Sequence, residues 1–433
     1  MLRTHRAADV KPDNRVIVGG WVHDIRNLGK LCFVLLRDQS GLIQITAKKG
    51  ETPEELFTTL HQLKKESVIL VAGSSVQGQS KAGVELIPER MELLSDVEGV
   101  LPMDMSLSID TTLDTRLDAR SVDLRREHVN AIFKVQSKIV QEMQTFLAKN
   151  GFMQVFTPCL MSTASESGSE VFSVNYFKTK AYLRQDPQLH RQLTIAGGFE
   201  KIYDIGTSFR AELSHTTRHI CEHRACAVEL AFIKDEYDVM EIEQDMMHTV
   251  LQALHKEMPQ IVEQFNAHCT IPKKFPVIEF PQIYDIFSEL GFQIPFGTAY
   301  GSEEEKALGT YVKEKFNSDI FFVNKFPFEE KPFYVMRYED DPRWARSTDM
   351  IFKGVELSSG GQREHRYHEL IRQVHEKKIS PESVAWFTDF FKYGVPPHGG
   401  FAIGIERLTM QFLNLTNVRE AVLFPRDTKR LSP

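Results

Sequence analysis

A glycine-rich strand that runs directly into a helix near the C-terminus constrains the fold most. Residues 399–408 read Gly-Gly-Phe-Ala-Ile-Gly-Ile-Glu-Arg-Leu. Glycines in a strand let a ligand approach the backbone closely. Ile405, Leu408 and Phe412 then recur on one side of the helix, and Arg407 at its start can meet a phosphate or stack on a base. Glycine-rich patterns are weak evidence alone, so this segment predicts a ligand site without naming the ligand.

A hairpin with a basic loop points to a phosphate-bearing ligand. Residues 201–212 form one predicted strand, residues 213–221 a polar loop, and residues 222–232 the return strand. Arg210 and Glu212 fall on one face of the first strand. Arginine presents a planar fork to phosphate oxygens and stays charged. The hairpin therefore predicts a site for a nucleoside triphosphate, with a solvated surface hairpin as the alternative.

The remaining chain predicts two domains of different character. Short strand-like runs cover residues 16–94, with one helix near 54–65, which suits a small closed barrel of the OB type. Residues 101–127 are polar and predict a linker. From residue 128 a long helix ends at Lys149-Asn150-Gly151, and strands then alternate with helices without βαβ regularity. We expect a barrel over 1–100 and an antiparallel α+β domain over 128–433.

Composition excludes some classes of protein. No apolar run is long enough to span a bilayer, and the N-terminus lacks the apolar core of a signal peptide. The 5 cysteines include no CxxC pair, so we expect a cytoplasmic protein without a disulfide framework. The net charge of -7 does not indicate a nucleic-acid binder, and any RNA contacts would have to be local basic patches.

Taken in order, three segments resemble the signature motifs of class II aminoacyl-tRNA synthetases. Pro158 matches the motif 1 proline at a dimer interface, Arg210 the motif 2 arginine and Arg407 the motif 3 arginine. Flanking residues are similar to the aspartyl/asparaginyl/lysyl subgroup and, across essentially the whole chain, to aspartyl-tRNA synthetases of the compact archaeal/eukaryotic type. The resemblance implies an OB-fold anticodon-binding domain and a catalytic domain built on an antiparallel sheet flanked by helices. It also implies a homodimer that converts L-aspartate and ATP to aspartyl-adenylate and loads tRNA-Asp.

The resemblance also implies an ATP site with Mg²⁺. Arg210 and Arg407 would be catalytic, with Arg210 on the α-phosphate. The implied ATP-binding residues are Arg210, Glu212, Arg218, His219, His223, Glu356 and Arg407. The implied Mg²⁺ ligands are Asp349, Glu356 and Ser359. Mg²⁺ is held by a few carboxylates and takes its other ligands from phosphates and water.

Two further sets of residues would recognise the amino acid and the tRNA. The implied amino-acid contacts are Glu166, Asp186, Gln188, Arg191, Glu229, Ser359, Arg363 and Gly404. Arg363 would grip the side-chain carboxylate and Glu166 the ammonium group. In the barrel, Arg26, Phe33 and Gln44 would stack on or read anticodon bases. A barrel-core aromatic is the alternative for Phe33.

The chain departs from the family pattern inside the amino-acid pocket. Asp186 replaces a serine, Arg191 a lysine, Ala227 an aspartate, and His223 a phenylalanine that stacks on adenine. One carboxylate is lost and one gained, so the changes either compensate each other or alter the substrate. The alternatives are an asparaginyl-tRNA synthetase and a diverged paralogue that adenylates another amino acid. A non-catalytic RNA-binding relic is disfavoured because the ATP residues are present.

Two details stay open at this point. His23 and Lys81 give conflicting indications on whether tRNA-Asn is charged as well. His219, Cys221, His223 and Cys226 provide the donors of a tetrahedral zinc site. Their spacing is tighter than in the usual fingers, and they overlap the loop of motif 2, so the zinc interpretation is disfavoured.

Overall fold

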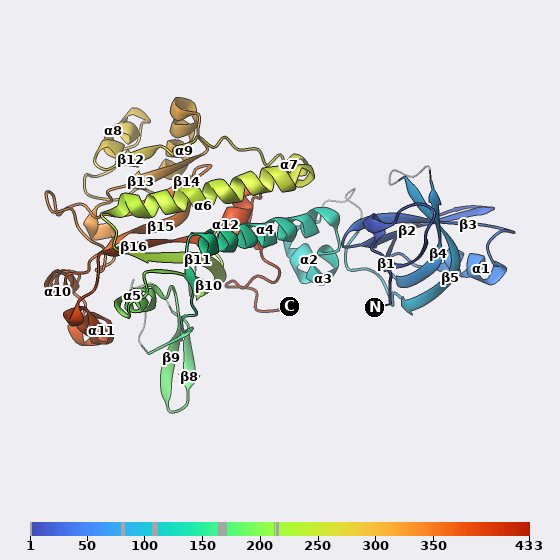
Figure 1. Ribbon diagram of the computed structural model, residues 1–433, viewed down its shortest axis with the longest axis horizontal. Coiled ribbons are helices and arrows are strands. Elements are labelled where there is room, and N and C mark those ends of the chain that lie inside the picture. Colours follow the sequence, from blue (N-terminus) through green and yellow to red (C-terminus); the bar gives the residue numbers. More distant parts are fainter. Residues whose placement is uncertain (1, 79–82, 106–110, 163–170, 212, 214–215) are drawn as a thin grey trace. The chain divides into compact units, whose positions relative to one another are not determined.

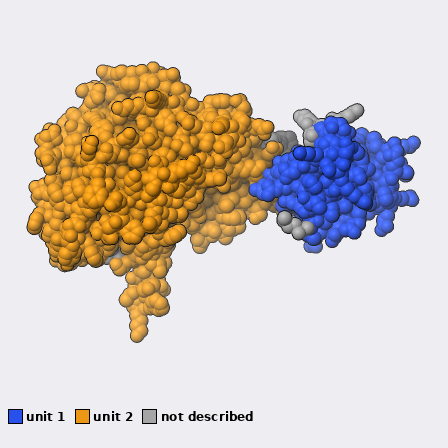
Figure 2. Space-filling view, viewed as in Figure 1, with its two compact units in different colours: residues 1–102 blue, residues 103–433 orange. Residues whose placement is uncertain are grey.

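The computed structural model divides into two compact units, residues 1–102 and 103–433 (Figure 2). It describes the whole chain except residues 1, 79–82, 106–110, 163–170, 212 and 214–215. Lys81, Glu166 and Glu212 therefore lie outside the described residues. In the described part of the chain, no helix is both long and apolar enough to cross a membrane.

The first unit is the predicted OB-type barrel. It closes in the strand order β1-β2-β3-β5-β4. Alternate residues such as Val34, Leu36, Ile43 and Ile45 point inward and are buried, as the two-residue period of a strand requires. The elements are η1 (Ala7–Asp9), β1 (Arg15–Leu28), β2 (Leu31–Asp38), β3 (Gly41–Lys48), α1 (Glu54–Gln62), β4 (Val68–Gln77) and β5 (Val84–Ser95).

The second unit is built on an eight-stranded sheet with the order β12-β13-β14-β15-β16-β11-β10-β6. Neighbouring strands are antiparallel except the two edge pairs, β12–β13 and β10–β6, which are parallel. The strands are β6 (Met153–Gln154), β10 (Lys201–Phe209), β11 (Glu222–Ala231), β12 (Val277–Glu279), β13 (Ile320–Asn324), β14 (Ser347–Phe352), β15 (Val355–Arg363) and β16 (His398–Gly404). A separate small sheet contains β7 (Leu160–Met161), β8 (Ser173–Tyr176) and β9 (Thr179–Leu183). The α+β prediction is confirmed.

Helices α4 and α6 lie along one face of this sheet (Figure 1) and bury the main core against it. In α4, Ile132, Val135, Ile139 and Met143 recur at helical spacing and are buried. The helix ends at the predicted place, where Gly151 takes a φ of +79° that favours glycine. The opposite face of the sheet is left for the pocket described below.

The other helices complete the second unit. Their bounds are α2 (Leu113–Asp118), α3 (Arg120–Asp123), α4 (Glu127–Lys149), α5 (Gln188–Ala196), α6 (Glu236–Glu257), α7 (Pro259–Gln264), α8 (Gln282–Glu289), α9 (Ser302–Phe316), η2 (Phe328–Glu330), α10 (Tyr367–Glu376), α11 (Pro381–Thr388), η3 (Asp389–Tyr393), α12 (Ile405–Phe412) and η4 (Val418–Ala421). Residues 101–127, expected as a polar linker, contain α2 and α3. These helices belong to the second unit, to which they are joined by the bonds of Arg120 to the carbonyls of residues 420, 422 and 423 and by the pair of Arg116 with Glu420.

Candidate active site

Most of the implied ATP and amino-acid residues line one pocket in the second unit. It is walled by β10, β11, β15 and β16, and the implied residues that line it are Asp186, Gln188, Arg210, Arg218, His219, His223, Glu356, Ser359, Arg363, Gly404 and Arg407. Arg191, Glu229 and Asp349 lie behind the wall, each bonded to a lining residue or beside one. The two-residue period explains the arrangement, since Cys226, Val228 and Leu230 of β11 point into the core instead.

Cationic side chains form part of the pocket lining. Arg210 follows β10, and its backbone N–H donates to the carbonyl of Cys221 at 2.9 Å, which closes the base of the hairpin. Arg407, at the start of α12, donates from Nη1 to the carbonyl of Glu356 at 2.9 Å. Burial and the charges of Arg210 and Arg407 lower the pKa of His223 to about 4. His223 therefore offers a neutral ring beside two fixed cations.

Two carboxylates and a hydroxyl form an acidic corner of the pocket. Asp349 of β14 and Ser359 of β15 are direct partners in the ladder, and Glu356 lines the pocket on β15. Burial and the neighbouring carboxylate of Asp349 raise the pKa of Glu356 to about 7. Lys331 places its ammonium 3.2 and 3.3 Å from the two oxygens of Asp349. The oxygen donors of Asp349, Glu356 and Ser359 fit a hard cation such as Mg²⁺, which would take its remaining ligands from phosphates and water.

The zinc interpretation gains no support. Among the described residues, no group of three or more His, Cys, Asp or Glu side chains gathers as a metal site. The reason is the strand period: His223 faces the pocket, whereas Cys226 is fully buried in the core on the other face of β11.

A buried network of Arg363, Glu229 and Gln188 forms another part of the pocket wall. Arg363 donates from Nε to Glu229 Oε1 at 3.0 Å and from Nη2 to the carbonyl of Gly400 at 3.0 Å. Gln188 donates to Glu229 Oε2 at 3.0 Å. Only glycine fits at position 400, because a Cβ there would lie 2.0 Å from the carbonyl oxygen of Val228. Within the described chain, Nη1 of Arg363 has no hydrogen-bond partner, which leaves a donor for a carboxylate ligand.

The two unusual charges of this pocket pair with each other. Arg191 is almost fully buried and donates from Nη2 to Asp186 Oδ2 and to Gln188 Oε1, both at 2.8 Å. Burial opposes ionisation of Asp186, but the charge and hydrogen bond of Arg191 outweigh it and hold the pKa of Asp186 below its usual value. Ala227 is buried opposite Asp204 in the ladder. The carboxylate gained at Asp186 therefore partners the arginine.

The implied anticodon residues lie on the outer face of the barrel. Arg26 and Phe33 are ladder partners, as are Phe33 and Thr46. Gln44 donates to Thr46 at 3.2 Å and so lies on the same side of its strand. The core alternative for Phe33 is wrong, because its inward neighbours Cys32 and Val34 fill the barrel while Phe33 is only half-buried.

Three residues of this region carry no motif that sequence reasoning could have used. Lys331 pairs with Asp349. Glu305 of α9 accepts from Arg218 Nη1 at 3.4 Å and from the backbone N–H of Glu356. Glu243 of α6 lies beneath β15, where its carboxyl accepts from the hydroxyl of Ser358. Each contact joins segments far apart in sequence.

Comparisons with known families match both units. Residues 112–428 match the family model described as tRNA synthetases class II (D, K and N). Residues 16–94 match an OB-fold nucleic acid binding domain.

Similar proteins are found along the full length of the chain. An aspartate–tRNA(Asp) ligase of Pyrococcus abyssi is 40% identical, and an aspartate–tRNA(Asp/Asn) ligase of Methanopyrus kandleri is 42% identical, each over 100% of both chains. Among solved structures, an asparaginyl-tRNA synthetase from Pyrococcus horikoshii complexed with asparaginyl-adenylate has a TM-score of 0.93 at 31% identity, with 100% of both chains covered. A putative aspartyl-tRNA synthetase from Leishmania major has a TM-score of 0.90 at 27% identity, covering 100% of this chain and 95% of that one.

Proposed function

The chain belongs to the class II tRNA synthetases of the D, K and N group. On that basis we propose which reaction the residues of the pocket catalyse. The enzyme is an aspartate–tRNA ligase: it activates L-aspartate with ATP to aspartyl-adenylate, releases pyrophosphate and transfers the aspartyl group to tRNA-Asp. The observation that carries this proposal is that one pocket is lined both by the cations Arg210, Arg218 and Arg407 and by Arg363 and Gln188 of the buried Arg363–Glu229–Gln188 network. Full-length identity of 40% or more to aspartate–tRNA ligases supports it.

Positioning and charge neutralisation supply the catalysis. In the proposed mechanism Arg210 binds the α-phosphate and stabilises the charge that develops as the amino-acid carboxylate attacks in line. Arg407 and Arg218 bind the rest of the triphosphate, and the neutral ring of His223 lies beside the adenine. Mg²⁺, held by Asp349, Glu356 and the hydroxyl of Ser359, would neutralise the leaving pyrophosphate. Gly404 lets the ligand approach the backbone at the end of β16.

The amino acid would be read at the buried end of the pocket. Hydrogen bonds to Glu229 and to the carbonyl of Gly400 hold the guanidinium of Arg363 in place. Its Nη1 has no partner among the described residues, so it can donate to the side-chain carboxylate of the substrate. Gln188 holds the arginines from the other side, and Asp186 and Arg191 complete the wall. We keep Glu166 as the proposed ammonium contact and Glu212 as an ATP contact, although both lie outside the described residues.

The wider assignments follow from the same reaction. Arg26, Phe33 and Gln44 would bind the anticodon on the outer face of the barrel. Pro158 supports a homodimer through its match to motif 1. Because tRNA and ATP are the substrates, we propose a cytoplasmic enzyme.

Pyrophosphate exchange tests the proposal. ATP–pyrophosphate exchange is measured with the purified protein for all twenty amino acids, without and with tRNA. Exchange that depends on aspartate alone supports the assignment. Exchange with asparagine or another amino acid would refute the aspartate specificity and assign the effect to Asp186 and Arg191. A charging assay with purified tRNA-Asp and tRNA-Asn then decides the RNA range, since a strict enzyme forms no product with tRNA-Asn.

A further inference from the structure

A segment after α12, here called the C-terminal strap (residues 417–427), bonds to the backbone of residues 216–221. These residues, here called the ATP-binding loop, lie between β10 and β11 and include Arg218 and His219. The N–H of Val418 donates to the carbonyl of Thr217 at 2.9 Å, and Nη1 of Arg419 donates to the carbonyl of Thr216 at 2.9 Å. The N–H of Cys221 donates to the carbonyl of Arg426 at 2.7 Å. These three bonds flank Arg218 and His219, the loop residues that line the pocket.

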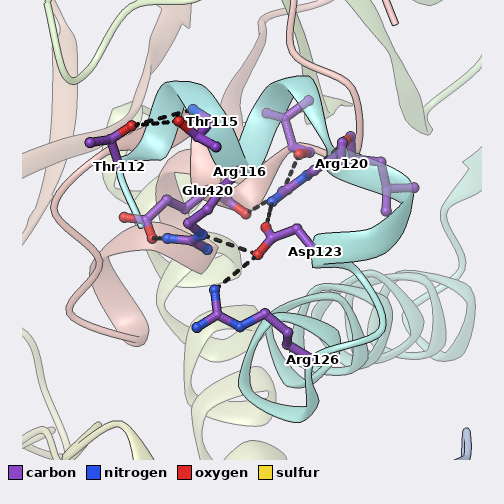
Figure 3. Close-up of polar contacts among 9 residues, drawn as sticks. Thr112, Thr115, Arg116, Arg120, Asp123, Arg126 and Glu420 are labelled. Carbon is purple, nitrogen blue, oxygen red and sulfur yellow. Dashed lines mark hydrogen bonds and ion pairs between the residues drawn. The ribbon is translucent and has the colours of Figure 1, made fainter. Parts of the chain in front are cut away.

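The other side of the strap is gripped by one arginine of α3 (Figure 3). Arg120 donates from Nε to the carbonyl of Leu423 at 2.9 Å and from Nη2 to those of Val422 and Glu420 at 2.7 and 3.1 Å. Its Nη1 donates to Asp123 at 2.8 Å, and the side chain is fully buried. All three nitrogens of the guanidinium therefore donate, and most of these bonds go to the strap.

Two salt bridges hold the strap in place, one between two of its own residues and one to α2. Within it, Arg419 pairs with Asp427 and both side chains are buried. Arg116 of α2 pairs with Glu420 at 3.1 Å (Figure 3). Charge-assisted bonds of this kind are stronger than neutral ones and geometrically specific. The strap is thus a braced connection between α2–α3 and the loop.

The loop depends on this brace because its own hairpin ends early. The β10–β11 ladder stops at the Phe209–Glu222 pair, and one further bond, from Arg210 to Cys221, closes the base. Arg218 and His219 lie beyond that base. The strap contacts at residues 216, 217 and 221 hold the backbone on both sides of them, and Arg218 is also held by the bond from its N–H to Thr216 Oγ1 and by its pair with Glu305.

We propose that Arg120 and Arg419 are positioning residues for the ATP-binding loop and act on Arg218 and His219 through the C-terminal strap. This inference rests on the proposed function only in taking the pocket to bind ATP. Neither arginine lines the pocket. The brace fixes the carbonyls of Thr216 and Thr217 beside Arg218 and His219, so damage to the brace displaces these two residues, weakens ATP binding and spares the amino-acid contacts.

The test replaces Arg120 with lysine. Arg120→Lys keeps the charge beside Asp123, but the three N–H donors of one ammonium cannot serve three carbonyls and the Asp123 carboxylate at once. Binding of ATP and of aspartate is measured separately by titration calorimetry at a temperature where near-UV circular dichroism shows native packing. We expect the Kd for ATP to rise about tenfold and the Kd for aspartate to change less than about twofold. Arg419→Lys tests the contact between the strap and the loop. We expect the same result, a raised Kd for ATP and a nearly unchanged Kd for aspartate, and this variant decides the question if Arg120→Lys does not fold.

Arg126→Lys is the matched control. Arg126 is a buried arginine that approaches the same carboxylate, Asp123, at 3.4 Å (Figure 3), but it grips that carboxylate rather than the strap. The Arg126→Lys variant should bind ATP with the same Kd as the wild type. The proposal is overturned if both Kd values rise together, if the Kd for ATP stays within twofold in the brace variants, or if Arg126→Lys weakens ATP binding equally. ATP binding without aspartate-dependent exchange in the wild type would refute the proposed function and leave this test intact.

Discussion

Removing the charge of Asp186 should make the pocket prefer aspartate over asparagine more strongly. Asp186 lines the pocket and bonds to Nη2 of Arg191 at 2.8 Å. The charge of Arg363 also lowers the pKa of Asp186, and a substrate carboxylate held by Arg363 would lie on the order of 5 Å from Asp186, given ordinary charge-assisted bond lengths. Two negative charges at that distance repel by about 3 kcal/mol at an effective dielectric constant of about 20. The side chain of Asp186 is 40% exposed, and solvent screening reduces this to about 1 kcal/mol.

The expected result for Asp186→Asn is a roughly fivefold rise in the ratio of kcat/KM for aspartate to that for asparagine. The amide keeps an oxygen acceptor for Arg191, so the arginine retains a bond while the repulsion disappears. The ratio is informative because both amino acids carry the same ammonium group, and any attraction of Asp186 for that group cancels. The assay is ATP–pyrophosphate exchange with each amino acid at saturating ATP.

Glu222→Gln serves as the control for a general change of charge, since Glu222 pairs with Arg224 at the start of β11 and does not line the pocket. It should leave the ratio unchanged. An unchanged or lower ratio in Asp186→Asn would refute the reasoning, because it would mean that Asp186 does not face the substrate side chain.

The remaining predictions concern the phosphate end, the barrel and the core. Arg210→Ala should abolish aspartate-dependent pyrophosphate exchange by removing a transition-state contact, and near-normal exchange would exclude that role. Gln44→Ala should raise KM for tRNA in charging assays and leave exchange without tRNA unaffected; an equal loss of both would show that the barrel is not a separate recognition module. Burial raises the pKa of Glu243 from 4.5 to about 8, so the folded protein binds a proton that the unfolded chain releases at lower pH. Its contribution to stability should be complete below about pH 4.5 and disappear as the pH rises toward 8. In Glu243→Gln the free energy of unfolding, measured by urea titration, should depend less on pH across that range, and an unchanged pH dependence would contradict the assignment.

Local sequence signals accounted for much of the fold. The end of α4 at Gly151 and the β10–β11 hairpin were predictable because turn residues and two-residue alternation act over a few positions. The barrel was predictable for the same reason. Residues 101–127 were read as a linker because α2 and α3 are too short to show a period, and their burial depends on the pairing of Arg120 with Asp123 and on carbonyls about 300 residues away.

Site residues could be predicted where they belong to a sequence motif. Residues that join the site through ion pairs between segments far apart in the sequence could not be predicted. Arg210, Arg363 and Arg407 stand in recognisable patterns. Lys331, Glu305 and Glu243 are joined to site residues only through tertiary contacts. Asp186 and Arg191 show why substitutions are hard to read from sequence. Separately they are a misplaced acid and a lysine replaced by arginine, but the start of α5 brings them to 2.8 Å. A buried charge is tolerated when it is paired. The acid missing at position 227 and the acid present at position 186 therefore amount to a single change, which moves the counter-ion of Arg191 from one position to the other. That relocation puts the counter-ion in the pocket wall beside the proposed substrate, and amino-acid selectivity should therefore respond to Asp186 more than to Ala227.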